Sequence, residues 1–423
     1  MINVRGDGIV ASLLVMMGGS SAAKIVTIIS TPIITRLVSP EEYAVYATFT
    51  AVLAVCSAIA TLRFSSALVV SDNERDASAL YTLSILAALC IAIGSFTFLV
   101  VSQLVGQGYP TFSTSYIWWL LPVSVLCLGF YQASDATALR DRHYATLASV
   151  EVAKETVSSV TKSLLAFWGL GAVGLVAGLI VKEAFGICAL FAQRPIRAKL
   201  VKVCRDPSDL ILTAHRYRDF PIYQSWSQLL LSASASAPLL LMNVIYDPEQ
   251  VGFFALAFSV IFLPVNLVSQ SARRVLYAES SDAKRGGERG AVRTVVLKVL
   301  AGLVPIALLA SLILLFFSED LIGVIFGENW RPAGEYTRAL TVLAIVRMFA
   351  TPMAALFNVF EKQKLQLLLN IARLILIGIV FIFISFQSLA GPDAVVLYAC
   401  ILSFYNIAIA GLAWLLVNHS FEK

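Results

Sequence analysis

Carboxylate and ammonium side chains gather in one apolar stretch of the chain, residues 144–168. In an α-helix, Glu151, Lys154, Glu155 and Lys162 would share one face within an arc of about 140°. Glu151 and Lys154 have the i, i+3 spacing of an ion pair, whereas Glu151 and Glu155 form an i, i+4 pair of like charges. The like-charge pair is costly unless one carboxyl group is protonated or a cation lies between the two. We therefore predict that Glu151 and Glu155 could bind a coupling proton or sodium ion, and simple pairing with Lys154 and Lys162 is the alternative.

Lys24 lies near the middle of another apolar stretch, residues 9–37. A helix crosses the bilayer in about 20 residues, so neither end of this stretch is close to the ammonium group. Five polar residues of the stretch share one helical face: Ser20, Lys24, Thr27, Thr31 and Thr35. Such a face is expected to point at other helices or at a water-filled cavity rather than at lipid. We interpret Lys24 as a cavity-lining residue, and pairing with a carboxylate of a neighbouring helix is the alternative.

Other ionisable residues also fall inside apolar stretches, and bases outnumber acids among them. They include Arg63, Lys182, Glu183, Arg347 and Arg373. Uncompensated cations at bilayer depth are costly, and a passing anion would neutralise them. A phosphate or diphosphate group suits lysine as a point charge and arginine as a planar fork. The excess of positive charge therefore predicts an anionic cargo.

These patterns define two predicted sets of functional residues. The set expected to bind a diphosphate or other anionic group is Lys24, Arg63, Lys154, Lys182 and Arg347. The ion-coupling candidates are Glu151, Glu155 and Glu183. Most of the cationic set lies in the first half of the chain, where we expect the site.

The elements that must position these residues are membrane-spanning helices. The chain has 423 residues, of which 59% are hydrophobic and 13% charged, well below the charged fraction of a soluble protein. Polar punctuation separates twelve predicted spans: 9–36, 42–70, 77–103, 115–139, 144–168, 171–196, 219–245, 251–278, 291–317, 332–360, 365–387 and 394–418. The predicted fold is therefore an all-α integral membrane protein with twelve transmembrane helices.

The distribution of basic residues predicts the orientation of the spans. With both termini in the cytoplasm, most of the 31 lysines and arginines fall in cytoplasmic loops and termini, as the positive-inside rule requires. The net charge of +5 is thus explained by topology, and we expect no nucleic-acid partner. The longest cytoplasmic connection divides the chain into an N-terminal six-helix lobe (1–200), a linker (201–218) and a C-terminal six-helix lobe (219–423).

The two halves contain one matching tract. Residues 38–47 match residues 246–255, with Pro40 recurring as Pro248, and each tract leads from an odd-numbered span to the next. A Pro-Glu step fits the first turn of a helix, where the missing N–H costs nothing and a carboxylate meets the positive end of the dipole. The match predicts an internal duplication with both halves running in the same direction.

Motifs for enzyme chemistry are missing from the sequence. The six cysteines form no CxxC or His–Cys cluster, and neither GxSxG nor a phosphate-binding P-loop occurs. We therefore predict no catalytic residue, no metal site and no cofactor beyond a coupling ion.

Three tracts resemble the Wzx-type polysaccharide flippases of the multidrug/oligosaccharidyl-lipid/polysaccharide exporter superfamily. They are Ser30–Tyr43, Ala60–Ala67 and Phe326–Gly334. One departure is Ala44, where the family is expected to have glycine, although Gly252 occupies the equivalent position in the second half.

This resemblance implies a fold and a function. The two six-helix lobes would form a V around a central cavity, with Lys24 and Arg63 in tracts where cationic cavity residues are expected. An undecaprenyl-diphosphate-linked oligosaccharide would cross from the cytoplasmic to the periplasmic leaflet of the bacterial inner membrane by alternating access, driven by H⁺ or Na⁺. The product would be O-antigen, capsule or exopolysaccharide. The polysaccharide polymerase and the chain-length regulator would be candidate partners, beside the lipid bilayer itself.

Two alternative functions stay open at this stage. A cation-coupled multidrug exporter of the same superfamily would need a carboxylate-dominated site, and carboxylates are outnumbered in the spans. A membrane polymerase or ligase acting on the same lipid carrier would need an acid or base on a sizeable outer loop, and the outer loops here are short and lack histidine.

Overall fold

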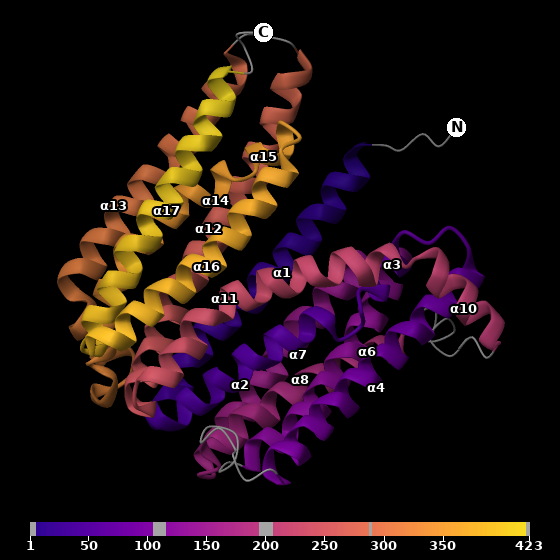
Figure 1. Cartoon of the computed structure of the whole chain (residues 1–423), viewed down its shortest axis with the longest axis horizontal. Coiled ribbons are helices and arrows are strands. Elements are labelled where there is room, and N and C mark those ends of the chain that lie inside the picture. Colours follow the sequence, from indigo (N-terminus) through magenta and orange to yellow (C-terminus); the bar gives the residue numbers. More distant parts are fainter. Residues whose placement is uncertain (1–5, 105–115, 194–205, 287–289, 420–423) are drawn as a thin grey trace. The chain divides into compact units, whose positions relative to one another are not determined.

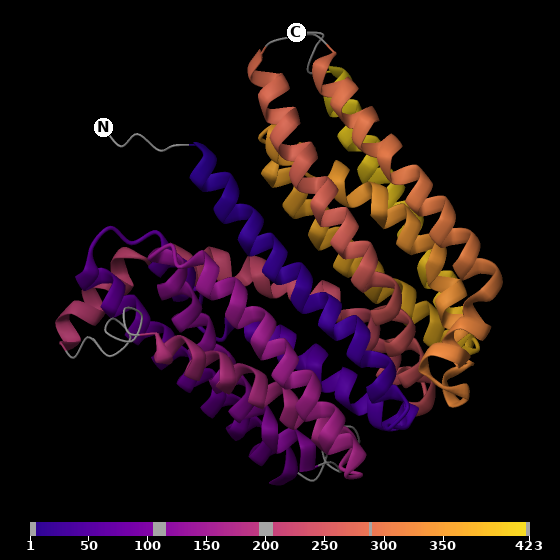
Figure 2. The same ribbon diagram turned by 180° about the vertical axis from the view of Figure 1, so that it is seen from behind.

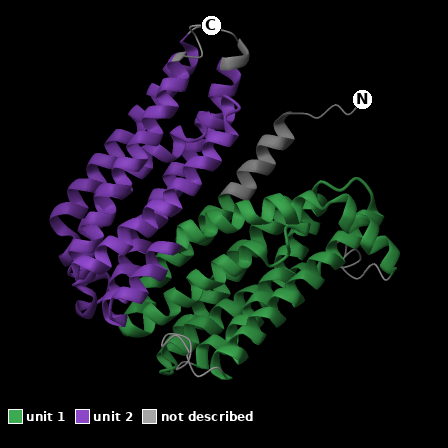
Figure 3. Cartoon of the chain, viewed as in Figure 1, with its two compact units in different colours: residues 1–236 green, residues 237–423 purple. Residues whose placement is uncertain are grey.

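The computed structural model describes residues 6–104, 116–193, 206–286 and 290–419. Within these ranges the backbone is almost entirely helical and contains no strand (Figure 1). The chain forms two compact units, residues 1–236 and residues 237–423 (Figure 3). The predicted all-α fold is confirmed.

Unit 1 contains nine α-helices and two short irregular turns among its described residues. They are α1 (Gly6–Thr35), α2 (Pro40–Ile59), α3 (Phe64–Val69), α4 (Glu74–Leu104), the 3₁₀ turn η1 (Tyr116–Leu120), α6 (Leu121–Arg140), α7 (Tyr144–Phe167), α8 (Gly171–Ala192), α10 (Pro207–Arg216), the π-helical turn η2 (Phe220–Gln224) and α11 (Ser225–Ile245), which continues into unit 2.

Unit 2 contains the remaining helices. They are α12 (Pro248–Gly286), α13 (Ala291–Phe326), the 3₁₀ turn η3 (Glu328–Trp330), α14 (Ala333–Met353), α15 (Leu356–Val359), α16 (Gln363–Gln387) and α17 (Gly391–His419). Helix α14 packs against α12, α13 and α17. In unit 1, α6 likewise packs against α2, α4 and α8, which is the pairing that an internal duplication would produce.

Ten helical segments in the described part of the chain are long and apolar enough to cross a membrane, so the chain is a multi-pass membrane protein. Helices α1 and α7, with 30 and 24 residues, also have the length to span the bilayer but are not among the ten. The number twelve, the V and its central cavity stay predictions.

The matching tracts at 38–47 and 246–255 do begin helices. Ser39 caps α2: its hydroxyl accepts a hydrogen bond from the Glu42 backbone N–H at 3.3 Å, and the Glu42 carboxylate accepts one from the Ser39 N–H at 3.1 Å. Pro40 and Pro248 are the first residues of α2 and α12. The expectation that each Pro-Glu step starts a helix is confirmed.

Two predicted spans are not single helices. The predicted span 42–70 breaks between Ile59 and Phe64, where Leu62 and Arg63 have positive φ angles of 45° and 59°. The predicted span 332–360 breaks after Met353 and resumes in α15. Such breaks cannot be recognised from hydropathy, because the apolar sequence continues through them and hydropathy does not depend on backbone conformation.

The linker between the predicted lobes is partly folded onto unit 1. Its residues 201–205 lie outside the described residues, but α10 packs on α4. Two ion pairs join the helices: Arg75 donates to Asp209, with its Nε 2.7 Å from Oδ2, and Arg216 lies 2.8 Å from Asp76. A hydrogen bond from the Ser208 side chain lowers the pKa of Asp206, which caps α10, below its usual value. The boundary between the packed units falls beyond this linker, inside α11.

Close packing of α1 on α7 depends on one glycine. A Cβ atom on Gly19 would lie 2.6 Å from the Ala148 Cβ and 2.7 Å from the Ala148 Cα, whereas Gly18 has nothing within 4 Å. Figure 2 shows α1, in indigo, running beside α7.

We expect Gly19→Leu to destabilise the protein by about 1–3 kcal/mol or more, because overpacking would push α1 off α7. Gly18→Leu is the matched control, and it should be neutral or slightly stabilising because it replaces an exposed helical glycine. Thermal unfolding of the purified proteins measures both. Equal midpoints for the two variants would show that α1 does not pack as described.

Candidate functional site

A buried polar cluster in unit 1 is built on α7 and receives side chains from α1, α2, α6 and α8. The polar face of α7 that the sequence predicts is largely buried: Lys154, Glu155, Ser158, Ser159 and Lys162 are all at most 7% exposed. Helix α7 packs against both α1 and α8, which explains the burial. The cluster therefore holds several charges away from solvent.

Two hydroxyl groups of α1 contact this cluster, and one of them, Thr27, belongs to the predicted polar stripe. The Thr27 hydroxyl donates to Glu155 Oε1 at 3.0 Å, and the Ser30 hydroxyl donates to Ser159 Oγ at 3.0 Å. Glu155 also forms an ion pair with Lys182 of α8. Its carboxylate is thus neutralised by one ammonium group and further satisfied by a hydroxyl.

Lys154 lies among several acidic groups. Its Nζ is 2.9 Å from Glu151 Oε2 and 3.7 Å from Glu183 Oε2, and it sits over the Tyr131 ring at 3.6 Å from the centroid. The predicted i, i+3 pair of Glu151 and Lys154 is confirmed. Glu183 Oε2 accepts no hydrogen bond.

A third carboxylate joins this group through Tyr131. The Tyr131 hydroxyl lies 3.3 Å from Glu151 Oε2 and 3.5 Å from Asp135 Oδ1, so it can donate to only one of them at a time. Lys154 therefore pairs with both Glu151 and Glu183, whereas Asp135 has no ion pair among the described residues. With Glu155, four carboxylates face the three ammonium groups of Lys154, Lys162 and Lys182, so the cluster carries one excess negative charge when all groups are ionised.

Lys162 is held differently from the sequence expectation. Its ammonium group donates to the Tyr46 hydroxyl at 3.0 Å, whereas the ion pair of Glu155 is made with Lys182. The alternative expectation paired Lys162 with a carboxylate of α7, and this pairing is wrong. Helix α8 packs against α7, so that Lys182 of α8 pairs with Glu155 instead.

Two of the five predicted anion-binding residues, Lys154 and Lys182, are therefore engaged in ion pairs. The other three have no carboxylate partner in the described part of the chain: Lys24, Arg63 and Arg347. Lys24 is half-buried on the α1 face that carries Thr27. The alternative in which a neighbouring carboxylate satisfies Lys24 does not hold within the described residues.

Arg63 stands in the break between α2 and α3. Its Nε is buried and makes no hydrogen bond, and both Arg63 and Leu62 adopt the left-handed backbone region that costs bulky residues energy. Strained backbone residues of this kind cluster at functional sites, and here the residue carries a guanidinium group without an ion pair among the described residues.

Unit 2 also carries two cationic side chains, Arg347 and Arg373, although the sequence predicted a cationic site mainly in the first half of the chain. Arg347 of α14 stacks over the Phe262 ring, 4.6 Å from its centroid, and Arg373 of α16 has a buried Nε without a hydrogen-bond partner. The two guanidinium groups repel each other electrostatically. Cations without an ion pair among the described residues therefore occur in both units. The expected site in the first half accounts only for Lys24 and Arg63.

Three residues described above were outside the predicted sets: Asp135 and Tyr46 of the cluster, and Arg373 of unit 2. Asp135 and Arg373 are visible as charges inside spans, but nothing in the sequence connects Asp135 to Glu151 across two helices. Tyr46 looks like an ordinary aromatic residue of a span. Its role as the hydrogen-bond partner of Lys162 depends on helix packing alone.

Two solved structures share this fold at low sequence identity. An inward-facing multidrug resistance MATE family transporter of the MOP superfamily has a TM-score of 0.72 at 15% identity, over 96% of this chain and 94% of that one. The lipid II flippase MurJ, in an inward closed conformation, has a TM-score of 0.69 at 14% identity, over 94% and 86%. The chain therefore shares the two-lobe fold of these two membrane proteins.

Residues 33–335 match the family described as polysaccharide biosynthesis protein, and the chain belongs to this family. The teichuronic acid biosynthesis protein TuaB of Bacillus subtilis (strain 168) is 22% identical over 324 residues, which are 75% of this chain and 64% of TuaB. The chain thus spans just under two thirds of that relative. Family and fold together support a flippase or transporter in general, in agreement with the expectation that the chain is not an enzyme.

Proposed function

We propose that the protein is a flippase that moves an undecaprenyl-diphosphate-linked oligosaccharide from the cytoplasmic to the periplasmic leaflet of the bacterial inner membrane. The glycan would serve O-antigen, capsule or exopolysaccharide synthesis. Membership of the polysaccharide biosynthesis family supports the biological process, and the positive-inside rule supports cytoplasmic termini.

One observation carries this proposal: Lys24 and Arg63 have no carboxylate partner among the described residues, although both belong to apolar segments. An unpaired cation at bilayer depth is unstable unless an anion or water compensates it. A lipid-linked diphosphate would neutralise the cation while it is bound, and the neutralisation would end when the lipid is released. Arginine can bind such a group with two parallel hydrogen bonds, and lysine binds it as a point charge.

Lys154, Lys182 and Arg347 complete the proposed cationic set, in different states. Lys154 and Lys182 already neutralise carboxylates, so they would reach the substrate only if their ion pairs open. Arg347 is stacked on Phe262 and needs no pair to open. Lys24 and Arg63 of unit 1 are therefore the first contacts we assign to the diphosphate, and Arg347 is the corresponding candidate of unit 2.

The acidic part of the cluster supports coupling to a cation. Glu155 is neutralised by Lys182, and Glu151 and Glu183 both pair with Lys154, which leaves Asp135 without an ion pair among the described residues. The ammonium group of Lys154 already occupies the position between Glu151 and Glu183, which leaves little room for Na⁺. A proton on one of the three carboxyl groups removes the excess charge without needing that room, so we favour H⁺ over Na⁺ as the coupling ion.

The test is flipping of a fluorescent polyprenyl-diphosphate oligosaccharide by purified protein in lipid vesicles. We expect flipping above the rate of protein-free vesicles, and faster flipping under a pH gradient than under a Na⁺ gradient. Absence of flipping with the protein correctly inserted would contradict the function, and acceleration by Na⁺ alone would contradict the choice of ion.

The same preparation separates the alternatives. A multidrug exporter would instead confer drug resistance on a sensitive host, and a polymerase or ligase would change the chain length or release sugar from the carrier. The polysaccharide polymerase and the chain-length regulator remain proposed partners, which co-purification from a strain that makes the glycan would reveal.

A further inference from the structure

A pocket in unit 2 carries cationic and amide side chains that none of the roles above uses. It has a volume of about 330 Å³ and is lined by Gln270, Arg273, Arg274 and Tyr277 of α12, with Ala355 and Asn358 from the α15 region. The α12 residues follow the i, i+3, i+4, i+7 spacing of one helical face. Helix α15 packs against α12, so the short helix after the α14 break closes the pocket.

The charge of this pocket is wholly positive. Its lining contains two guanidinium groups, two amides and a phenol but no carboxylate, and neither arginine has a carboxylate partner in the ranges that the structure describes. Arg273 is half-buried and Arg274 is exposed, so both can present N–H donors to a ligand.

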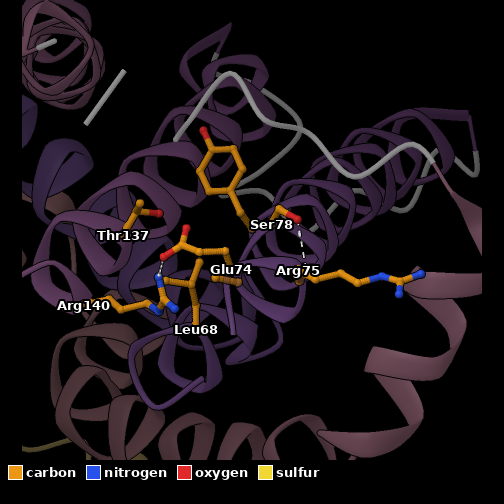
Figure 4. A pocket seen from close by; sticks show the side chains of 8 residues that line it. Leu68, Glu74, Arg75, Ser78, Thr137 and Arg140 are labelled. Carbon is orange, nitrogen blue, oxygen red and sulfur yellow. Dashed lines mark hydrogen bonds and ion pairs between the residues drawn. The ribbon is translucent and has the colours of Figure 1, made fainter. Parts of the chain in front are cut away.

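A pocket of unit 1 provides an instructive contrast (Figure 4). It also contains two arginines, in a volume of about 210 Å³. There, however, Arg140 lies 2.8 Å from Glu74 Oε1 and donates to the Ser71 carbonyl oxygen at 3.3 Å, and Arg75 is paired with Asp209. Those donors are already occupied, whereas Arg273 and Arg274 have no ion pair with the residues that the structure describes.

The depth of the unit 2 pocket indicates what could fill it. At a rise of about 1.5 Å per residue, Arg273 is about 37 Å along α12 from Pro248, which is more than the thickness of the hydrocarbon core. The pocket therefore lies at headgroup level, at the end of α12 that the positive-inside rule assigns to the cytoplasm. Anionic groups found at this level are phosphates carried by lipids.

We infer that the pocket formed by Gln270, Arg273, Arg274, Tyr277 and Asn358 binds the phosphate or diphosphate group of a membrane lipid. The guanidinium forks bind the phosphate oxygens, and the amides and the phenol hydrogen-bond to the neighbouring ester or sugar oxygens. The lipid could be a polyprenyl diphosphate or an anionic phospholipid, which offer the same chemistry. The site is distinct from the cations of α1, α2–α3, α14 and α16 assigned above.

The inference is tested by measuring the binding of two lipid probes to the purified protein in detergent by native mass spectrometry. The two probes are farnesyl diphosphate and phosphatidylglycerol. We expect Arg273→Gln/Arg274→Gln to weaken binding of at least one probe by roughly tenfold or more, because two charge-assisted contacts are lost. The matched control is Lys362→Gln/Lys364→Gln, which removes two exposed charges next to the pocket but outside its lining.

A second variant keeps both arginines. Asn358→Asp places a carboxylate in the pocket and should also weaken binding, by pairing with the guanidinium groups and repelling the phosphate. If the substitutions weaken binding of farnesyl diphosphate alone, the ligand is a polyprenyl carrier. If they weaken binding of phosphatidylglycerol, the ligand is a phospholipid headgroup. Equal losses in the arginine and lysine variants, or unchanged binding by Asn358→Asp, would overturn the inference. Because binding is measured without transport, this result is independent of whether flipping occurs.

Discussion

The double substitution Lys24→Ala/Arg63→Ala should reduce flipping of a polyprenyl-diphosphate oligosaccharide to near the background of protein-free vesicles. Each residue offers a charge-assisted contact of about 1.5–3 kcal/mol to the diphosphate, and losing both corresponds to a reduction of roughly 10²-fold or more. In cells that depend on this protein, surface polysaccharide should disappear while the protein stays in the membrane.

The stability of this variant is as informative as its activity. Because neither cation has a carboxylate partner among the described residues, removing them should leave thermal stability unchanged or slightly raised. The charge-keeping variant Lys24→Arg/Arg63→Lys is the control and should retain measurable flipping. Full flipping by the alanine variant would show that the substrate does not use these groups. A collapse of its unfolding midpoint would show that they stabilise the fold instead.

The helices could be predicted from the sequence because the bilayer imposes their length and apolarity. Contacts inside one helix were equally accessible: the ion pair between Glu151 and Lys154 follows from a spacing of three residues. The start of α2 follows from the Pro40–Glu41 step, which occupies its first turn.

Contacts between helices could not be predicted in the same way. Lys182 reaches Glu155 because α8 and α7 pack in one particular register, and the sequence contains no local signal for that register. For the same reason, counting charges along the spans suggested an excess of free lysines in the first half, although packing neutralises Lys154 and Lys182. Charge surplus in a membrane protein is therefore meaningful only after the ion pairs between helices are known.

The backbone break at Arg63 was hidden for a different reason. Its neighbours are apolar, so hydropathy continues smoothly through residues where φ is positive. The sequence analysis singled out this region only through the resemblance of the tract Ala60–Ala67 to polysaccharide flippases. That resemblance predicts a cationic residue at position 63, but it does not predict the backbone conformation.

Lys182→Met should have the opposite signature to the loss of Lys24 and Arg63. It removes one partner of a largely buried ion pair, in which the side chains of Lys182 and Glu155 are 21% and 10% exposed. Glu155 would keep the hydrogen bond from Thr27 and the weaker, more distant attraction of Lys162, but no ion pair among the described residues. Leaving a buried carboxylate uncompensated typically costs about 3–5 kcal/mol, a large part of the stability of most proteins. We expect a strong fall in both the unfolding midpoint and the amount of folded protein in the membrane.

A second substitution separates the loss of a partner from the loss of the lysine itself. Glu155→Gln/Lys182→Met removes both charges, and it should recover most of the stability because no buried charge is left unpaired. Lys24→Met is the matched control, since it deletes a half-buried lysine of α1 that has no carboxylate partner among the described residues, and it should unfold near the wild-type midpoint. If Lys182→Met were as stable as Lys24→Met, or if the double variant were no better than the single one, the ion pair between α7 and α8 would not hold these helices together. In that case Lys182 would be as free as Lys24 to meet an anionic substrate, and the division of the lysines into packing and binding groups would fail.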